Sequence, residues 1–264
     1  MGVVNKDKQN KRLGETRMMN CGMEATIIKY INSMNVDIQF ADGYVVKNRT
    51  YSDFKNNSII NPYAKTIYNV ACLGEDKATY IDPITKRNKK FDSYVHWYEM
   101  IRRCYNPKEI NKFKNYNSCT VCEEWLNYST FKKWYNNNYY KVNNEEMRLD
   151  KDILIKGNKI YSPETCIFVP NRINVLFTNR KNDRGKYPIG VYLYNGKFKS
   201  QCSTHKDGVT SRILIGTFNT SEEAFYSYKE FKEKYIKEVA DEYKDRIPKK
   251  LYDAMYKYEV EITD

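Results

Sequence analysis

Short runs of alternating apolar and polar residues follow a polar start to the chain. Residues 1–12, MGVVNKDKQNKR, have no hydrophobic period and predict a flexible basic arm. Residues 13–64 contain MEATIIKYI, VDIQFAD and GYVVKNR, whose alternation is typical of strands with one buried face. Between the last two runs, Asp42-Gly43 indicates a type I′ hairpin turn. We expect a small β-barrel or β-meander in this segment.

The pattern changes to helical after a short hairpin predicted within residues 68–90. The run SYVHWYEMIRRC, residues 93–104, places its large apolar side chains on one face of a helix, which Asn106-Pro107 ends. Residues 123–135, EEWLNYSTFKKWY, predict a second helix rich in aromatic residues. We expect these aromatic side chains to form a core.

A hairpin followed by a helix is predicted in the centre of the chain. Residues 148–155 predict a strand, Gly157-Asn158 a turn, and residues 159–161 the return strand. The SPET stretch that follows resembles a helix cap, whereas the IFV after it is equally typical of a strand. A helix is expected from Pro170 to about Phe177.

Three alternating strands and a long helix are predicted near the C-terminus. The strands are IGVYLY, KFKSQCS and RILIGTF, with a turn at Asn195-Gly196 and a polar loop, THKDGVTS. A helix begins at Ser221, and a closing helix with an acidic end follows Pro248. If the long helix covers one face of the sheet, alternation leaves a second set of side chains exposed. These are Tyr192, Tyr194, Lys197, Lys199, Gln201, Ser203 and Arg212.

The charge balance favours a polyanionic partner over a membrane. Lys and Arg number 45 against 33 Asp and Glu, a formal net charge of +12. Arg102 and Arg103, in the last turn of a predicted helix, complement the helix dipole or grip a phosphate. An ordinary lysine-rich protein is the alternative explanation of the charge. No apolar run is long enough to span a bilayer, so we expect a cytoplasmic protein.

Seven cysteines without a signal peptide predict a reducing compartment. Cys119 and Cys122 form a CxxC, which Cys104 or Cys166 could complete as a zinc site. No second CxxC is present, and the motif runs directly into a helical pattern. Buried thiols are therefore favoured, and zinc is not the expected cofactor.

Two segments resemble known families. The string LDKDILIKGNKIYSPETCIFVPNRIN resembles the ββα-metal core of phage-type HNH homing endonucleases, and GVY...GKFKSQCS...LIGTFNTSEEAFYSY resembles the AP2 DNA-binding domain. The segment before them looks like the SH3-like module that precedes such regions. The resemblance implies an α+β protein of three modules: SH3-like at 13–64, degenerate HNH-like at 65–186, and AP2-like with a C-terminal helix at 187–264.

The HNH resemblance also implies roles for individual residues. Asp150 and Asn174 would hold Mg²⁺, Asn158 lies in the loop, and Lys151 or Asp152 stands where the general-base histidine is expected. The block contains no histidine, since His96 and His205 both lie outside it. The cleavage chemistry therefore lacks its usual base.

The favoured interpretation is a sequence-specific double-stranded DNA-binding protein related to HNH homing endonucleases, with cleavage lost. If phage-encoded, it would act in the bacterial cytoplasm. One alternative is an active Mg²⁺-dependent site-specific endonuclease or nickase. Others are a phage counter-defence or regulatory factor acting on a nucleoprotein partner, and a protein-interaction module with a zinc-stapled centre.

Overall fold

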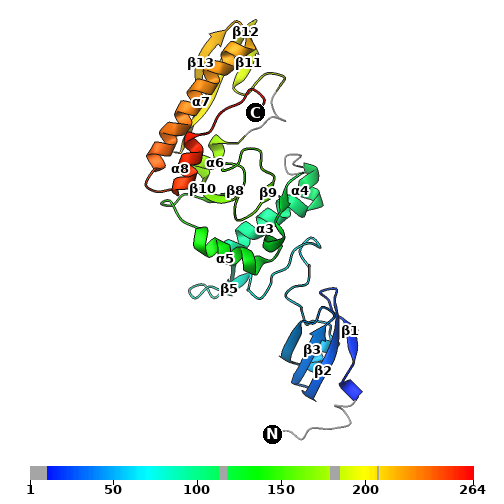
Figure 1. Cartoon of the computed structure of the whole chain (residues 1–264). Coiled ribbons are helices and arrows are strands. Elements are labelled where there is room, and N and C mark those ends of the chain that lie inside the picture. The colour runs from blue at the N-terminus through cyan, green and yellow to red at the C-terminus, as the bar shows by residue number, and fades with distance from the viewer. Residues whose placement is uncertain (1–10, 113–117, 179–184, 207) are drawn as a thin grey trace. The chain divides into compact units, whose positions relative to one another are not determined.

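The computed structural model describes residues 11–112, 118–178, 185–206 and 208–264, and it confirms a mixed α+β protein with several small sheets (Figure 1). The chain divides into two compact units, Met1–Asn137 and Asn138–Asp264. Most of the predicted arm, residues 1–10, lies outside the described residues. Within the described ranges, no helix combines the length and the apolarity needed to cross a membrane. The three-module division stays a prediction.

The first sheet is the predicted meander. Strands β1 (Thr16–Met18), β2 (Glu24–Asn32), β3 (Asn35–Phe40) and β4 (Val45–Arg49) pair antiparallel in sequence order. Alternate side chains of these strands form a core with Phe54 of the short helix α2 (Tyr51–Lys55). The core residues on the strands include Ile27, Val36, Ile38 and Phe40.

The turn between β3 and β4 is not the predicted type I′ turn. Phe40 N donates to Tyr44 O at 2.9 Å, which leaves three residues in the loop. Gly43 has φ +89°, but Asp42 is not in the positive-φ region. The Asp42 carboxylate instead accepts from Tyr44 N at 3.0 Å and from Asn61 Nδ2 at 2.8 Å. These side-chain bonds favour the three-residue loop, in which only the last residue is left-handed.

The rest of the first unit is mainly helical. Hairpin β5 (Thr79–Ile81) and β6 (Asn88–Lys90) precedes α3 (Asp92–Tyr105), α4 (Pro107–Lys112) and β7 (Thr120–Val121). The predicted hairpin, the first helix and its end at Asn106-Pro107 are confirmed. The indole of Trp97 on α3 is fully buried and donates from Nε1 to Trp125 O at 2.6 Å.

The single helix predicted over residues 123–135 is wrong. A 3₁₀ turn (Glu123–Leu126) and helix α5 (Tyr128–Asn138) are separated at Asn127, whose backbone is extended. Cys72 N donates to Leu126 O at 2.9 Å, and Tyr128 N donates to Cys72 O at 3.0 Å. These bonds to a distant segment replace the helical ones at the break.

The second unit begins with a small sheet whose pairing differs from the prediction. Strand β8 (Met147–Asp150) pairs antiparallel with β10 (Ile167–Pro170), not with residues 159–161, which form the separate short strand β9 (Ile160–Tyr161). All four residues of β10 are buried, whereas Ile160 is 49% exposed. Apolar burial therefore selects β10 as the partner. Helix α6 (Asn171–Leu176) then begins near the predicted position.

In the C-terminal sheet the second and third strands are longer than predicted, and the first is shorter. The order of the sheet is β11 (Val191–Tyr194), β12 (Lys197–Lys206) and β13 (Val209–Phe218), all antiparallel. Asn195 and Gly196 have φ of 49° and 73°, as a type I′ turn requires. The predicted polar loop is wrong, because pairing continues to His205↔Thr210 and beyond. The Tyr235 hydroxyl supports this extension by bonding both the N–H and the carbonyl of His205, at 2.8 and 2.9 Å.

Helix α7 (Ser221–Tyr243) takes part in two cores, and α8 (Lys249–Tyr256) packs beside it. The N-terminal half of α7 places Phe225 and Tyr228 against Cys202 of β12. Its C-terminal half joins Ile236 and neighbours to a core that includes β10, α6 and α8. A capping box between Thr220 and Glu223 begins the helix.

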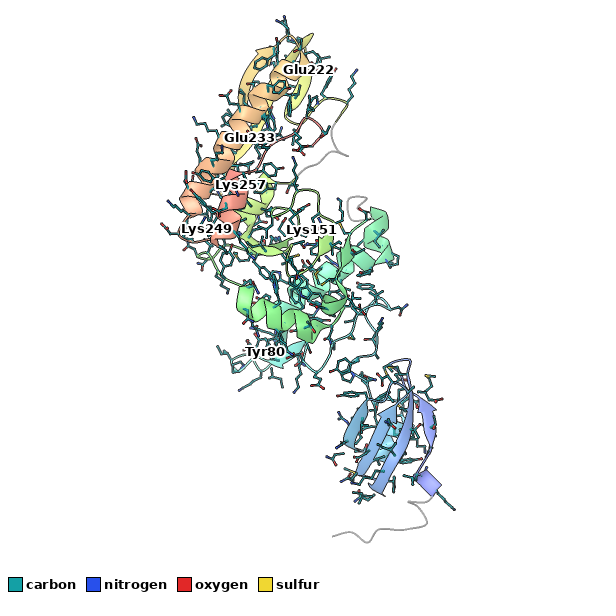
Figure 2. The ribbon with its side chains drawn as sticks, in the orientation of Figure 1. Tyr80, Lys151, Glu222, Glu233, Lys249 and Lys257 are labelled. Carbon is teal, nitrogen blue, oxygen red and sulfur yellow. The ribbon has the colours of Figure 1, made fainter. Side chains whose placement is uncertain are left out.

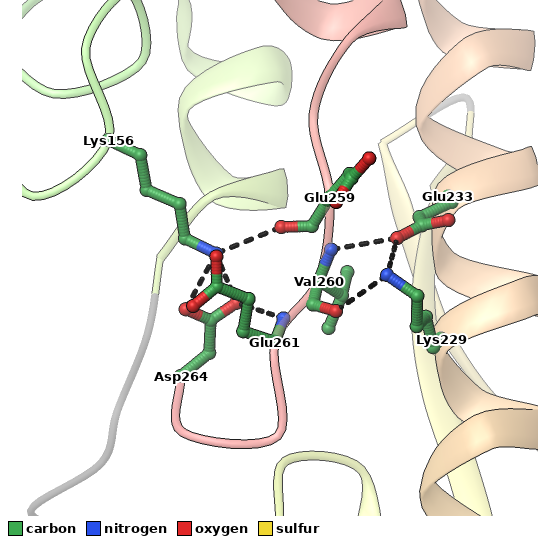
Figure 3. A network of polar contacts seen from close by, with 7 residues as sticks. All are labelled: Lys156, Lys229, Glu233, Glu259, Val260, Glu261 and Asp264. Atoms are coloured by element: carbon green, nitrogen blue, oxygen red, sulfur yellow. Dashed lines mark hydrogen bonds and ion pairs between the residues drawn. The ribbon is translucent and has the colours of Figure 1, made fainter.

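The last residues of the chain are held by two lysines (Figure 3). Lys156 Nζ lies 2.9 Å from the Asp264 carboxylate, and Lys229 Nζ donates to Val260 O at 2.8 Å. Glu233 accepts from both Lys229 Nζ and Val260 N, at 2.6 and 2.8 Å. The side chain of Val260 is consequently held in the core beneath the sheet, 4% exposed.

Substitution of Ile236 tests the shared helix. Ile236 is fully buried, so we expect Ile236→Ala to lower the free energy of unfolding by about 2–5 kcal/mol, through reduced burial and the cavity left behind. Tyr226→Ala is the control on the same helix, since Tyr226 is 64% exposed. Urea unfolding followed by circular dichroism measures both. Equal losses in the two variants would contradict the packing described.

Candidate functional site

One face of the C-terminal sheet carries all seven of the side chains expected to be exposed. In the antiparallel register Tyr192 lies opposite Lys199, Tyr194 opposite Lys197, and Ser203 opposite Arg212. Residues directly opposite each other project from the same face. The register shifts between Ser200 and Gln201, but β12 keeps its alternation there, because Ser200 and Cys202 are both buried. Gln201 therefore joins them. The open face is defined by Tyr192, Tyr194, Lys197, Lys199, Gln201, Ser203 and Arg212.

The other face of this sheet is covered by α7. Ser200 is fully buried and Cys202 is 2% exposed, and both alternate with the open-face residues of β12. Just before β11 the backbone comes so close to the helix that a Cβ on Gly190 would lie 2.1 Å from the Tyr228 ring. Because α7 covers only this face, the seven side chains above remain accessible.

The cations of the open face have no anionic partner among the described residues. Lys199 Nζ lies 4.1 Å from the centroid of the Tyr194 ring, and Lys197 Nζ donates to Asn219 Oδ1 at 2.6 Å. The ion pairs of the described residues do not include Lys197, Lys199 or Arg212. The face thus combines unneutralised positive charge with tyrosine and amide groups.

The predicted catalytic residues at the end of β8 form one tight loop. Asp150 Oδ1 accepts from Asp152 N and Ile153 N, both at 2.8 Å. Asn158 Nδ2 donates to the carbonyls of Lys151 and Ile160, both at 2.7 Å. Asn158 and one oxygen of Asp150 therefore hold the loop together.

The carboxylates of Asp150 and Asp152 in this loop repel each other when both are charged. Burial, and then the neighbouring Asp152, raise the pKa of Asp150 to about 6, against the two backbone amides that lower it. A cation held by Asp150 and Asp152 would relieve this cost, and Mg²⁺ there would polarise a phosphate. Lys151 is 7% exposed, and its Nζ lies 3.1 Å from Asp152 Oδ2.

The remaining predicted residues lie apart from this loop. Asn174 is half-buried on α6, and no hydrogen bond or ion pair of the described residues joins its side chain to Asp150. In the first unit, Arg103 Nη2 lies 3.3 Å from Glu99 Oε2 on the same helix. The Nε of Arg102 is buried. The ion pair of Arg103 agrees with a structural role at the end of α3.

The cysteines and histidines are distributed over several elements. Cys119 is buried and Cys122 half-buried. His96 packs against Tyr135, with ring centroids 5.9 Å apart, and His205 lies on β12 instead of in the predicted loop. Across the residues that the structure describes, no group of three or more His, Cys, Asp and Glu side chains is arranged to hold a metal ion.

Sequence reasoning missed Arg172. Its Nε donates to His205 O at 2.9 Å and its Nη1 lies 2.5 Å from Glu242 Oε2, so it joins α6 to β12 and α7. These partners are 33 and 70 residues away in sequence, and no local pattern marks such a contact. Leu214 was also missed; it lies opposite Gln201 on the open face and is 54% exposed.

Comparison with known proteins identifies no relative. No family model, no curated protein and no solved structure matches the chain. The chemistry of the open face and of the loop after β8 is therefore the basis for assigning a function.

The raised pKa of Asp150 predicts a measurable pH dependence of stability. Folded Asp150 keeps its proton up to about pH 6, whereas an unfolded aspartate loses it near about pH 4. The folded state binds more protons in this window, so this residue lowers the free energy of unfolding as the pH rises through it. Asp150→Asn should remove that component.

Urea unfolding at several pH values between about 4 and about 7 measures the difference. Asp92→Asn is the control, because Asp92 is an exposed carboxylate at the start of α3. The same pH profile for wild type and Asp150→Asn would show that Asp150 does not titrate in this window.

Proposed function

We propose that this protein binds double-stranded DNA, with sequence preference, through the open face of β11, β12 and β13. The observation that carries the proposal is that Lys197, Lys199 and Arg212 share one solvent-facing sheet surface with no described carboxylate to neutralise them. The formal net charge of +12 supports a polyanionic partner. The phosphate backbone of nucleic acid matches this chemistry.

The side chains of the open face suit both kinds of DNA contact. Lysines that neutralise phosphates release counterions and supply affinity independent of sequence. Arg212 and Gln201 offer the fork-shaped groups that hydrogen-bond guanine and adenine edges, and the major groove admits a β-ribbon. Twisted strands of ten residues, as in β12 and β13, provide such a ribbon.

The relation to HNH homing endonucleases and AP2 domains is part of this proposal. Support comes from a sheet of three strands backed by one helix, and from the order β8, β9, β10, α6 in the centre, in which β8 pairs with β10. The ion pair of Lys151 with Asp152 and the absence of histidine from residues 149–174 favour loss of cleavage. On this proposal the central segment is a nuclease core that has lost its cleavage activity. The protein would act in a phage-infected bacterial cell.

A metal-dependent endonuclease or nickase is the second candidate. It is favoured by the neighbouring carboxylates of Asp150 and Asp152, whose repulsion a divalent cation would relieve. Supercoiled DNA incubated with Mg²⁺ or Mn²⁺ tests it, beside an Asp150→Ala, Asp152→Ala variant. Metal-dependent nicks that disappear in the variant would establish an enzyme. Tight binding without nicks leaves the DNA-binding proposal alone.

The sheet placement predicts the effect of removing two open-face cations. Lys199→Ala, Arg212→Ala should weaken duplex binding and make the dependence of log K on log salt shallower by about 0.9 for each phosphate that is no longer neutralised. If Arg212 bonds a base edge, its removal should weaken the binding free energy by roughly a further 1–3 kcal/mol on a preferred site selected from random duplexes. Fluorescence anisotropy over a salt series measures both effects.

The matched control is Lys234→Ala, Lys237→Ala. These lysines are exposed on α7, away from its buried stripe, so the variant has the same reduction of charge. Equal weakening in both variants would attribute the effect to net charge alone and contradict the placement of DNA on the sheet.

A further inference from the structure

The β5–β6 hairpin of the first unit carries a second group of cations. Its sequence from residue 82, DPITKRNKK, contains Lys86, Arg87, Lys89 and Lys90, all exposed. Tyr80 of β5 marks this hairpin in Figure 2. The proposed function assigns nothing to it.

The single carboxylate of the hairpin is occupied within the turn. Asp82 is 7% exposed, pairs with Lys89, and accepts from Ile84 N and Thr85 N at 2.9 and 2.8 Å. The bond with Lys89 and those with the turn backbone lower its pKa to about 2. Lys86, Arg87 and Lys90 form no ion pair with any described carboxylate.

The backbone of the tip is held in a defined conformation. Lys86 N donates to Asp82 O and Asp82 N donates to Arg87 O, both at 2.9 Å. Lys86 has φ +54°, a region that glycine or asparagine adopts at lower cost than lysine. Lysine therefore occupies a turn position at which glycine would cost less in backbone conformation.

The base of the hairpin is anchored on the aromatic part of the unit. The Tyr80 and Phe91 rings lie 4.9 Å apart, and Lys132 Nζ of α5 lies 4.8 Å from the Phe91 centroid. Lys90 Nζ lies 5.7 Å from the Tyr98 ring of α3. The hairpin is therefore a fixed projection of the unit, and its charges are positioned before any partner binds.

We propose that the tip of the β5–β6 hairpin is a second DNA contact, at which Lys86, Arg87 and Lys90 bind the phosphate backbone of the duplex without reading its sequence. This inference rests on the proposed function and extends it to the first unit. A phosphate backbone fits because the group is cationic, rigid and free of internal neutralisation, and because lysine ammoniums bind phosphate as point charges.

The test replaces the three charged side chains with neutral polar ones. In the full chain, Lys86→Gln, Arg87→Gln, Lys90→Gln should weaken binding by the same factor on a selected site and on a scrambled duplex. The slope of log K against log salt should become shallower by about 2.7, at about 0.9 for each of three phosphates. Anisotropy with labelled duplexes over a salt series provides both readouts.

Two further variants control for net charge and for the shape of the hairpin. Lys234→Gln, Lys237→Gln, Lys250→Gln removes three exposed charges elsewhere and should change the slope far less. Lys86→Arg, Lys90→Arg retains the charges and should bind as wild type. Thermal melts establish that each variant is folded.

The outcomes separate this inference from the proposed function. A hairpin variant that binds like the charge-matched control overturns the inference, while Lys199→Ala, Arg212→Ala still tests the sheet. A loss of affinity confined to the selected site also overturns it, because the hairpin would then read sequence. If the hairpin variant weakens binding and the sheet variant does not, the inference stands and the sheet placement fails. Wild-type protein that binds no duplex at any salt overturns both.

Discussion

The second unit depends on the burial of one face of helix α7. Over 23 residues the helix buries Phe225 and Tyr228 against the C-terminal sheet, and Ile236 and Val239 against the segment that contains β10 and α6. Apolar burial on this scale is the main stabilising term in folding. Because one helix serves both cores, the sheet and the central segment are joined by a rigid element, and the sheet face away from the helix stays open to solvent.

The positive charges fall into two groups, according to whether they bond a carboxylate or backbone carbonyl of the described residues. Lys151, Lys156 and Arg172 bond carboxylates or backbone carbonyls within the unit. The lysines and the arginine of the open face have no such partner among the described residues, and the same is true of the β5–β6 tip. The cations with such partners hold segments together, whereas those of the open face and of the hairpin tip remain available to a polyanion. The net charge of +12 is therefore informative only once its distribution is known.

Local sequence was sufficient wherever local chemistry decides the structure. The Asn195-Gly196 turn, the end of α3 at Asn106-Pro107 and the alternation of the C-terminal strands were predictable from residue type and period. The predictions failed where a distant partner decides. Cys72 breaks the helix predicted over residues 123–135, and Tyr235 supports His205 in a strand that its polar neighbours made look like a loop.

For the candidate site, the sequence by itself placed seven side chains on the open face, although not Leu214. This was possible because side chains alternate along a strand and the Asn195-Gly196 turn was recognised. The sequence also determined that no histidine stands in residues 149–174. Only the tertiary structure decided that β8 pairs with β10, that Lys151 is ion-paired to Asp152, and that Arg172 joins α6 to β12 and α7. The physical reason is that burial and ion pairing depend on which distant segments meet, and hydrophobic period records only which face of an element is apolar.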